Sequence, residues 1–123
     1  FPMLLPKNQL TSRRDFDKVK RLGAILTTPF FVLSFFDRGR KGASLAPRFG
    51  FVTSTHLDKR ATKRNRVKRM LRESVRLFLK LEGERTKELP LDVVFVLRKR
   101  ILDQSYEAIS RLVNTFLSKI FKL

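Results

Sequence analysis

The stretch from Leu91 to Leu97, Leu-Asp-Val-Val-Phe-Val-Leu, constrains the fold of this chain more than any other. It has the length of a β-strand, follows Pro90, and is apolar at even and odd positions alike except at Asp92. Successive side chains of a strand point to opposite faces of a sheet, so a strand of this composition has to be covered on both faces. The sequence therefore predicts a central strand between packed layers.

Two amphipathic patterns predict helices that can supply this cover. A terminal helix starts at Asp103 or Ser105, and its apolar residues recur at i, i+3, i+4, i+7 spacing: Ile109, Leu112, Val113, Phe116, Leu117 and Ile120. A longer helix is predicted from about Arg60 to Leu81, ended by Gly83. Its buried stripe is expected to contain Val67, Leu71, Ser74 and Phe78.

The first half of the chain predicts one more helix and the remaining strands. Residues 1–10 are expected to be extended, because Pro2 and Pro6 disfavour helix around them. Residues 1–2 precede Met3 and are expected to be an addition to the native start. A short helix capped by Ser12 should end at Gly23. One or two strands are predicted over 24–37 and another over 49–55, with a loop over 38–44 between them.

These elements predict an α+β fold. The expected order is α-β-β-β-α-β-α, in a two-layer α/β sandwich with a mixed sheet of about four strands and three helices. Residues 1–123 form a single domain in this interpretation, since the sequence contains no linker, internal repeat or low-complexity block. The strand, long helix and strand between 49 and 97 can form a βαβ crossover, whose hand these patterns leave open.

The start of the long helix is exceptionally basic. Between Lys59 and Arg72 the chain has eight cations in fourteen residues and no acid: Lys59, Arg60, Lys63, Arg64, Arg66, Lys68, Arg69 and Arg72. Repulsion between cations one helical turn apart opposes helix formation, so a bound polyanion best explains such a segment. The alternative is a solvated charged face, which usually contains interleaved acids, whereas the first acid here is Glu73.

Charge and composition favour nucleic acid as that polyanion. The formal net charge is +17 and the isoelectric point about 11.4, while 42% hydrophobic residues, among them twelve Phe, provide a core. No run of eighteen apolar residues and no signal-peptide core occurs, so no membrane partner is expected. The absence of Cys excludes disulfides and cysteine zinc sites and agrees with a cytoplasmic location.

At 100° per residue, one arc of about 100° contains Asn65, Lys68, Arg69, Arg72 and Arg76, with Arg64 and Arg66 on its two sides. Asn65 is neutral and adds nothing to phosphate attraction. Its amide is expected to make a specific hydrogen bond, either to a base or sugar edge or to the protein's own backbone.

The same segment resembles the signature of the protein subunit of bacterial ribonuclease P. The resemblance rests on Arg64-Asn65-Arg66-Val67-Lys68-Arg69, with Ala61 before it and Leu71-Arg72-Glu73 after it. It extends to Leu10, Asp15-Phe16, Gly23, Phe31-Val32-Leu33, Arg48-Phe49-Gly50, Asp92-Val93-Val94 and the terminal amphipathic helix. It thus covers nearly the whole chain.

The resemblance implies a fold, a partner and an activity. The fold is an α/β sandwich with a left-handed βαβ crossover, an exception to the usual rule. The protein binds a large catalytic RNA and assists removal of the 5′ leader of precursor tRNA, as a monomer within the particle. No cofactor is bound by the protein alone, and Mg²⁺ is bound mainly by the RNA. The expected contacts to the catalytic RNA are Arg60, Lys63, Arg64, Asn65, Arg66, Lys68, Arg69, Arg72 and Arg76.

The resemblance also implies a cleft between the sheet and the first helix for the single-stranded leader. Its candidate residues are Arg13, Phe16, Lys20, Ser34 and Phe36. Phe16 can stack on a base, or it can be ordinary core. Lys20 and Ser34 stand where relatives often have aromatic residues, with Phe36 as a replacement ring, and Thr55-His56 stands where many have a basic pair.

Catalysis by the protein itself is not expected. His56 has no partner for a triad or a zinc site, Asp15 and Asp17 point to different sides of a helix, and the acids of residues 82–88 lie in a turn. Two other classes remain as alternatives: a ribosomal or general structured-RNA-binding protein, and a DNA-binding helix reader, which would need a second recognition helix near residue 60.

Overall fold

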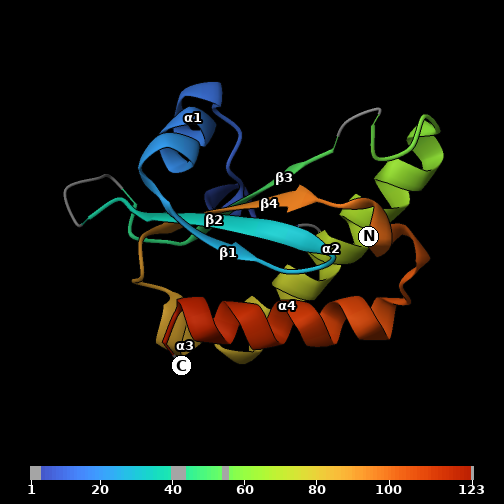
Figure 1. The fold of residues 1–123 in the computed structure, drawn as a ribbon. Helices are drawn as coiled ribbons and strands as arrows, with labels where there is room; N and C mark the ends of the chain where they lie inside the picture. Colours follow the sequence, from blue (N-terminus) through green and yellow to red (C-terminus); the bar gives the residue numbers. More distant parts are fainter. Residues whose placement is uncertain (1–3, 40–43, 54–55, 123) are drawn as a thin grey trace.

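The computed structural model describes residues 4–39, 44–53 and 56–122, and its order of elements confirms the predicted one (Figure 1). The longer elements are α1 (Arg13–Leu22), β1 (Ala24–Thr27), β2 (Phe31–Asp37), β3 (Arg48–Val52), α2 (Ala61–Leu81), β4 (Leu91–Leu97) and α4 (Tyr106–Ile120). The described chain also contains three short helical segments: η1 (Pro6–Asn8) before α1, α3 (Gly83–Thr86) after α2, and η2 (Lys99–Asp103) before α4.

The four strands form one mixed sheet in the order β1-β2-β4-β3. β1 pairs with β2 and β2 with β4 in antiparallel fashion, whereas β3 and β4 are parallel. The predicted central strand is therefore β4, and its Phe95 pairs with Leu33 of β2 and Phe51 of β3. Because α2 joins two parallel neighbours, the βαβ unit is confirmed. The left-handed sense of the crossover stays a prediction from the resemblance.

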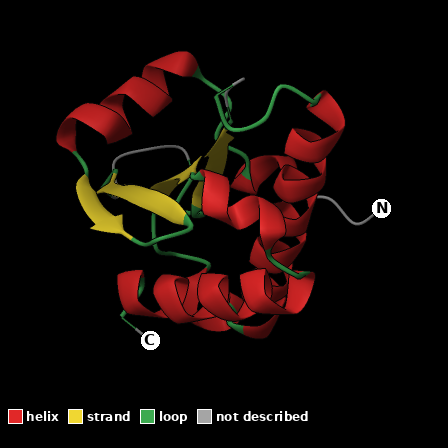
Figure 2. Ribbon diagram, turned by 45° about the vertical axis from the view of Figure 1, so that its right-hand side comes forward, coloured by secondary structure: helices red, strands yellow, loops and turns green. Residues whose placement is uncertain are grey.

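Helices α2 and α4 pack on one face of the sheet, and α1 lies on the other (Figure 2). The main core lies between the sheet, α2 and α4. Its largest fully buried side chains include four aromatic rings, one from each of β2, β3, α2 and β4: Phe31, Phe49, Phe78 and Phe95. The predicted stripe of α2 is buried as well. The core therefore holds the basic helix by its apolar side.

The α1 face of the sheet is only partly covered. Val94 packs with Val19 of α1 in a second, smaller cluster, whereas Val96, two residues further along β4, is 40% exposed. The predicted cover of both strand faces is thus wrong at Val96. With ten residues, α1 is about 15 Å long and covers one end of the sheet only (Figure 1).

Asp92, the polar exception in β4, lies at the covered end of this face. Its side chain is 4% exposed and accepts hydrogen bonds from Arg38 and, in bidentate form, from Arg48 at 2.8 and 2.7 Å. Arg48 also lies 3.3 Å from Asp15 of α1. The hydrogen bond from Arg48 to Asp92 is the main cause that raises the pKa of the guanidinium. This network ties α1 to β3 and β4.

Several predicted helix ends differ in detail. Ser105 caps α4 by accepting from the Ala108 N–H at 3.2 Å, whereas Ser12 precedes α1 without a side-chain capping bond. Gly83 does not end α2: the helix stops at Leu81, and Gly83 begins α3. The expected extended segment contains η1, which Pro6 starts.

The predicted strand over 49–55 is observed as β3 and ends at Val52. Residues 54–55 lie outside the described residues, as do residues 1–3 and part of the predicted loop over 38–44. No helix in the described part of the chain has both the length and the apolar character needed to span a membrane.

Candidate nucleic-acid interface

The first surface is the basic face of α2, defined as Arg60, Lys63, Arg64, Asn65, Arg66, Lys68, Arg69, Arg72 and Arg76. Val67, Leu71 and Phe78 are buried on the opposite side, which orients these polar side chains outward. Lys63, Asn65, Arg66, Arg69 and Arg72 are exposed, and Lys68 is half-buried. Burial, followed by the charges of Arg72 and Arg64, lowers the pKa of Lys68. The cations of this face therefore repel one another, and an anion would relieve the repulsion.

Some members of the basic face also have structural partners. Arg64 donates from Nη1 to the carbonyl oxygens of Asp58 at 2.6 Å and Lys59 at 3.0 Å, and so holds the chain just before α2. Arg60 donates twice to the carboxylate of Asp58, and this contact is the main cause that lowers the pKa of Asp58 to about 2. Arg76 is paired with Glu73 at 2.7 Å. Arg66 is thus a cleaner probe of ligand binding than Arg64.

Asn65 is exposed near the middle of the basic face. Its side chain makes no hydrogen bond to any described residue. Of the two expectations for Asn65, a bond to the protein's own backbone is therefore not observed within the described residues. The other expectation, a hydrogen bond from this amide to a base or sugar edge, stays a prediction.

The second surface is the part of the sheet that α1 leaves open. Val32, Val96 and Val52 lie side by side across β2, β4 and β3, as the strand register shows. Val52 is 38% exposed and Val96 is 40% exposed, while Val32 is half-buried. We call these three residues the open sheet face. The sequence analysis did not predict this face. The two-residue spacing of Val32, Ser34 and Phe36, which places all three on one face of the strand, was the pattern that could have indicated it.

Phe16 of α1 borders the open sheet face. Its ring lies against Gly50 of β3, the residue two positions before Val52. A cleft of about 250 Å³ runs from this ring around the outer edge of β3 to Arg72 of α2. Its remaining lining comes from β3 and from the segment before α1: Leu4, Gln9, Leu10, Thr11, Phe49 and Phe51. The guanidinium of Arg72 also lies 5.8 Å from the centre of the Phe51 ring, so Phe16 and the basic face share one cleft.

The other predicted leader-binding residues do not line this cleft. Phe36 shares a strand face with Ser34, as expected, and like Phe16 it packs against the smaller cluster, with Lys18 Nζ 5.6 Å from the centre of its ring. Ser34 is buried. Arg13 and Lys20 are exposed on α1 at the spacing that places them on the same side as Phe16. Arg13 and Lys20 thus lie on the same side of α1 as Phe16, and the leader-binding roles of all five residues stay predictions.

Gly50 determines where the Phe16 ring can lie. A Cβ atom at position 50 would come within 2.4 Å of the ring, which is far inside van der Waals contact. We expect Gly50→Ala to displace Phe16 and to lower the free energy of unfolding by about 1–2 kcal/mol, as overpacking does. Binding of a single-stranded RNA, followed by fluorescence anisotropy, should weaken, while binding to the basic face should not change. The control is Gly83→Ala, where an added Cβ meets no heavy atom within 4 Å; equal RNA binding by both variants would contradict the placement of Phe16.

The described acids do not assemble a metal site. No group of three or more His, Asp or Glu side chains that could hold a metal ion occurs in the described part of the chain. Asp15, Asp58 and Asp92 are instead paired with arginines. His56 is exposed. The carboxylates of Asp15, Asp58 and Asp92 thus neutralise arginines of the protein itself.

The fold, the basic helix and the adjoining cleft define a small α+β RNA-binding protein. The family model described as ribonuclease P matches residues 4–121, and the chain belongs to this family. The ribonuclease P protein component of Alkaliphilus oremlandii (strain OhILAs) is 30% identical over 113 residues, covering 92% of this chain and 90% of that protein.

Solved structures of the same family have the same fold. The ribonuclease P protein of Staphylococcus aureus superposes with a TM-score of 0.72 at 20% identity, over 92% of this chain and 94% of that chain. The protein from Thermotoga maritima gives a TM-score of 0.69 at 23% identity, over 90% and 96%. The chain is therefore a protein component of the tRNA-processing ribonucleoprotein, and RNA is its partner.

Proposed function

We propose that this protein binds the catalytic RNA of ribonuclease P through the basic face of α2 and the 5′ leader of precursor tRNA through the cleft beside Phe16. The observation that carries the proposal is that two chemically different surfaces adjoin at one cleft, where Phe16 and Arg72 both line the wall. One is a helix face of cations with a neutral amide at its middle, and the other is a cleft bordered by an aromatic ring and an open apolar strip.

The two surfaces suit different forms of RNA. Guanidinium groups donate in a planar fork that fits phosphate oxygens, so the basic face suits the closely spaced phosphates of a folded RNA. Unpaired bases stack on aromatic rings, which contributes about 1–3 kcal/mol per base, so Phe16 suits a single strand. Arg13 and Lys20 would attract the phosphates of that strand.

In this proposal cleavage takes place in the RNA, with Mg²⁺ bound mainly by the RNA, which supplies the hydrolytic chemistry. The protein contributes charge and orientation. It neutralises phosphates that would otherwise repel one another, and it fixes the leader on one side of the sheet. It acts as a monomer within the particle, in the cytoplasm.

A reconstitution experiment tests the proposal. Added to a bacterial catalytic RNA at low magnesium, the protein should restore cleavage of precursor tRNA at its 5′ end, because its cations replace part of the ionic screening. Binding to the catalytic RNA should weaken with salt, with a log-log slope on the order of −4 to −7 for six to eight neutralised phosphates. No cleavage, together with equal affinity for duplex DNA and the catalytic RNA, would instead favour a general nucleic-acid-binding protein.

A further inference from the structure

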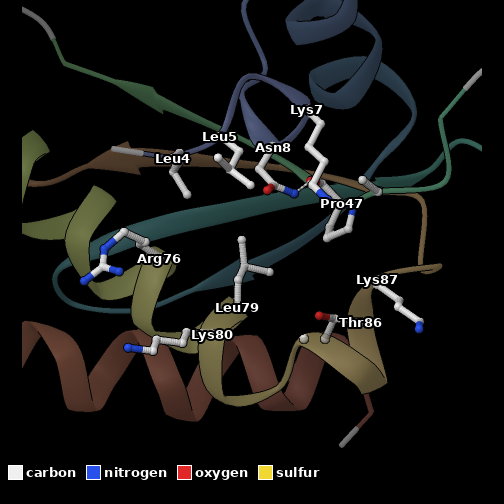
Figure 3. A pocket seen from close by; sticks show the side chains of 12 residues that line it. Leu4, Leu5, Lys7, Asn8, Pro47, Arg76, Leu79, Lys80, Thr86 and Lys87 are labelled. Atoms are coloured by element: carbon white, nitrogen blue, oxygen red, sulfur yellow. Dashed lines mark hydrogen bonds between the residues drawn. The ribbon is translucent and has the colours of Figure 1, made fainter. Parts of the chain in front are cut away.

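A second pocket lies on the opposite side of the sheet from α1, where the segment before α1 meets α2 and α3 (Figure 3). Its volume is about 410 Å³, within the range of about 300–1,000 Å³ typical of small-molecule sites. The floor is aliphatic and comes from three separate parts of the chain: Leu4, Ala46, Pro47 and Leu79. We call it the α2–α3 pocket.

Cations surround this aliphatic floor. Lys7 comes from η1, Arg76 and Lys80 from adjacent turns of α2, and Lys87 follows α3. Figure 3 shows Arg76 and Lys80 on one side of the pocket and Lys87 on the other. Arg76 is paired with Glu73 and Lys87 with Glu84, whereas Lys7 and Lys80 form no ion pair with any described residue. The rim therefore has an excess of positive charge.

Asn8 adds an oriented polar group to the pocket. Its Nδ2 donates to the carbonyl oxygen of Pro47 at 2.8 Å, which fixes the direction of the amide. Figure 3 shows the amide oxygen of Asn8 turned away from Pro47, toward the space above Leu79. This oxygen accepts no hydrogen bond from a described residue. A hydrogen-bond acceptor above an aliphatic surface suits a planar ring that carries an N–H donor on its edge. The cations around the pocket suit phosphate groups next to that ring.

From this combination we propose that the α2–α3 pocket takes one unpaired nucleotide of the catalytic RNA, with the base on the aliphatic floor and flanking phosphates at Lys7 and Lys80. The proposal rests on the proposed function of the basic face. Arg76 belongs to both the basic face and the pocket, so an RNA bound along α2 reaches the pocket without crossing the sheet. The leader cleft also touches Leu4, so a crosslink is needed to distinguish a nucleotide of the catalytic RNA from one of the leader.

Two variants test the occupant. Gly83→Trp fills the pocket, since Gly83 lines it and an added Cβ meets no heavy atom within 4 Å. The double variant Lys7→Glu/Lys80→Glu removes the proposed phosphate contacts. Its control, Arg111→Glu/Lys119→Glu, makes the same change in net charge at two exposed residues of α4.

Affinity for the full-length catalytic RNA is the readout, measured across a salt series with a single-stranded leader RNA in parallel. We expect the Lys7/Lys80 variant to bind the catalytic RNA about tenfold more weakly than its control, with a log-log slope shallower by about 2. Gly83→Trp should bind about fivefold more weakly than Gly83→Ala with an unchanged slope, because it displaces a base rather than phosphates. Affinity for the leader RNA should not change in any of these variants.

Photocrosslinking identifies the ligand directly. In the reconstituted particle, 4-thiouridine in the catalytic RNA should crosslink to a peptide lining the pocket, and Gly83→Trp should abolish that crosslink. A crosslink from the leader instead, or a protein dimer that Gly83→Trp disrupts, would overturn the proposal. The proposal would also be overturned if the Lys7/Lys80 variant and Gly83→Trp bound the catalytic RNA as tightly as their controls while Arg66→Ala still weakened binding. If Arg66→Ala bound the catalytic RNA as tightly as the unchanged protein, the proposed function itself would be rejected.

Discussion

Asp92→Asn is expected to lower the free energy of unfolding by about 3 kcal/mol. The Asp92 carboxylate is 4% exposed and accepts from both Arg38 and Arg48, which themselves are largely shielded from solvent. Removing the negative charge leaves Arg38 without an acidic partner and Arg48 with Asp15 alone, and breaking a buried pair in this way costs about 3–5 kcal/mol. Urea unfolding followed by circular dichroism measures the change.

The matched control is Asp103→Asn, which makes the same change in net charge at an exposed residue of η2. It should change stability by less than about 0.5 kcal/mol. Equal destabilisation by the two variants would show that net charge, rather than the network at Asp92, sets the stability. The network also holds Arg48 beside Asp15, so Asp92→Asn should loosen α1 and weaken leader binding in addition.

The double variant Arg64→Ala/Arg66→Ala is expected to lower affinity for the catalytic RNA roughly 100-fold. The estimate assumes two charge-assisted phosphate contacts at about 1.5 kcal/mol each, and the log-log salt slope should become shallower by about 2. Arg111→Ala/Lys119→Ala on α4 removes the same charge and should have a much smaller effect. Filter binding over a salt series measures both quantities.

Arg64 requires a separate comparison. It donates to the carbonyl oxygens of Asp58 and Lys59, so its removal can also loosen the start of α2. Arg66→Ala alone avoids this effect and should retain wild-type stability with about tenfold weaker binding. Unchanged affinity in both variants would remove the basic face from the catalytic-RNA interface.

The elements of this fold could be predicted because their signals are local. A continuous apolar run of strand length and a 3.6-residue repeat in a helix both depend on residues close together in the sequence, so β4, α2 and α4 were located closely. The basic face followed in the same way, since the apolar stripe of α2 fixes which side chains point outward. The prediction that Gly83 ends the long helix was wrong. Glycine often follows the last turn of a helix, whereas here it begins α3.

The leader-binding candidates were harder to predict because a cleft needs the distances between elements. Phe16 was identified, and Arg13 and Lys20 lie on the same side of α1. Phe36 was expected to replace a missing ring; it packs against the same small cluster as Phe16 but does not line the cleft, so its role stays a prediction. A strand pattern shows which residues share a face, and the length of the helix lying on that face decides which of them stay open.

Strand β4 shows the same difference between what local sequence patterns determine and what the tertiary structure determines. From the sequence alone, this chain has an apolar central strand, two amphipathic helices that can pack on it, and a cationic helix face, because each depends on residues close together along the chain. Only the tertiary structure decided why Asp92 interrupts that strand, where Phe16 borders a cleft, and how η1, α2 and α3 enclose a pocket. Those features join residues about forty positions apart, such as Arg48 with Asp92 and Asn8 with Pro47, and no local periodicity encodes such contacts.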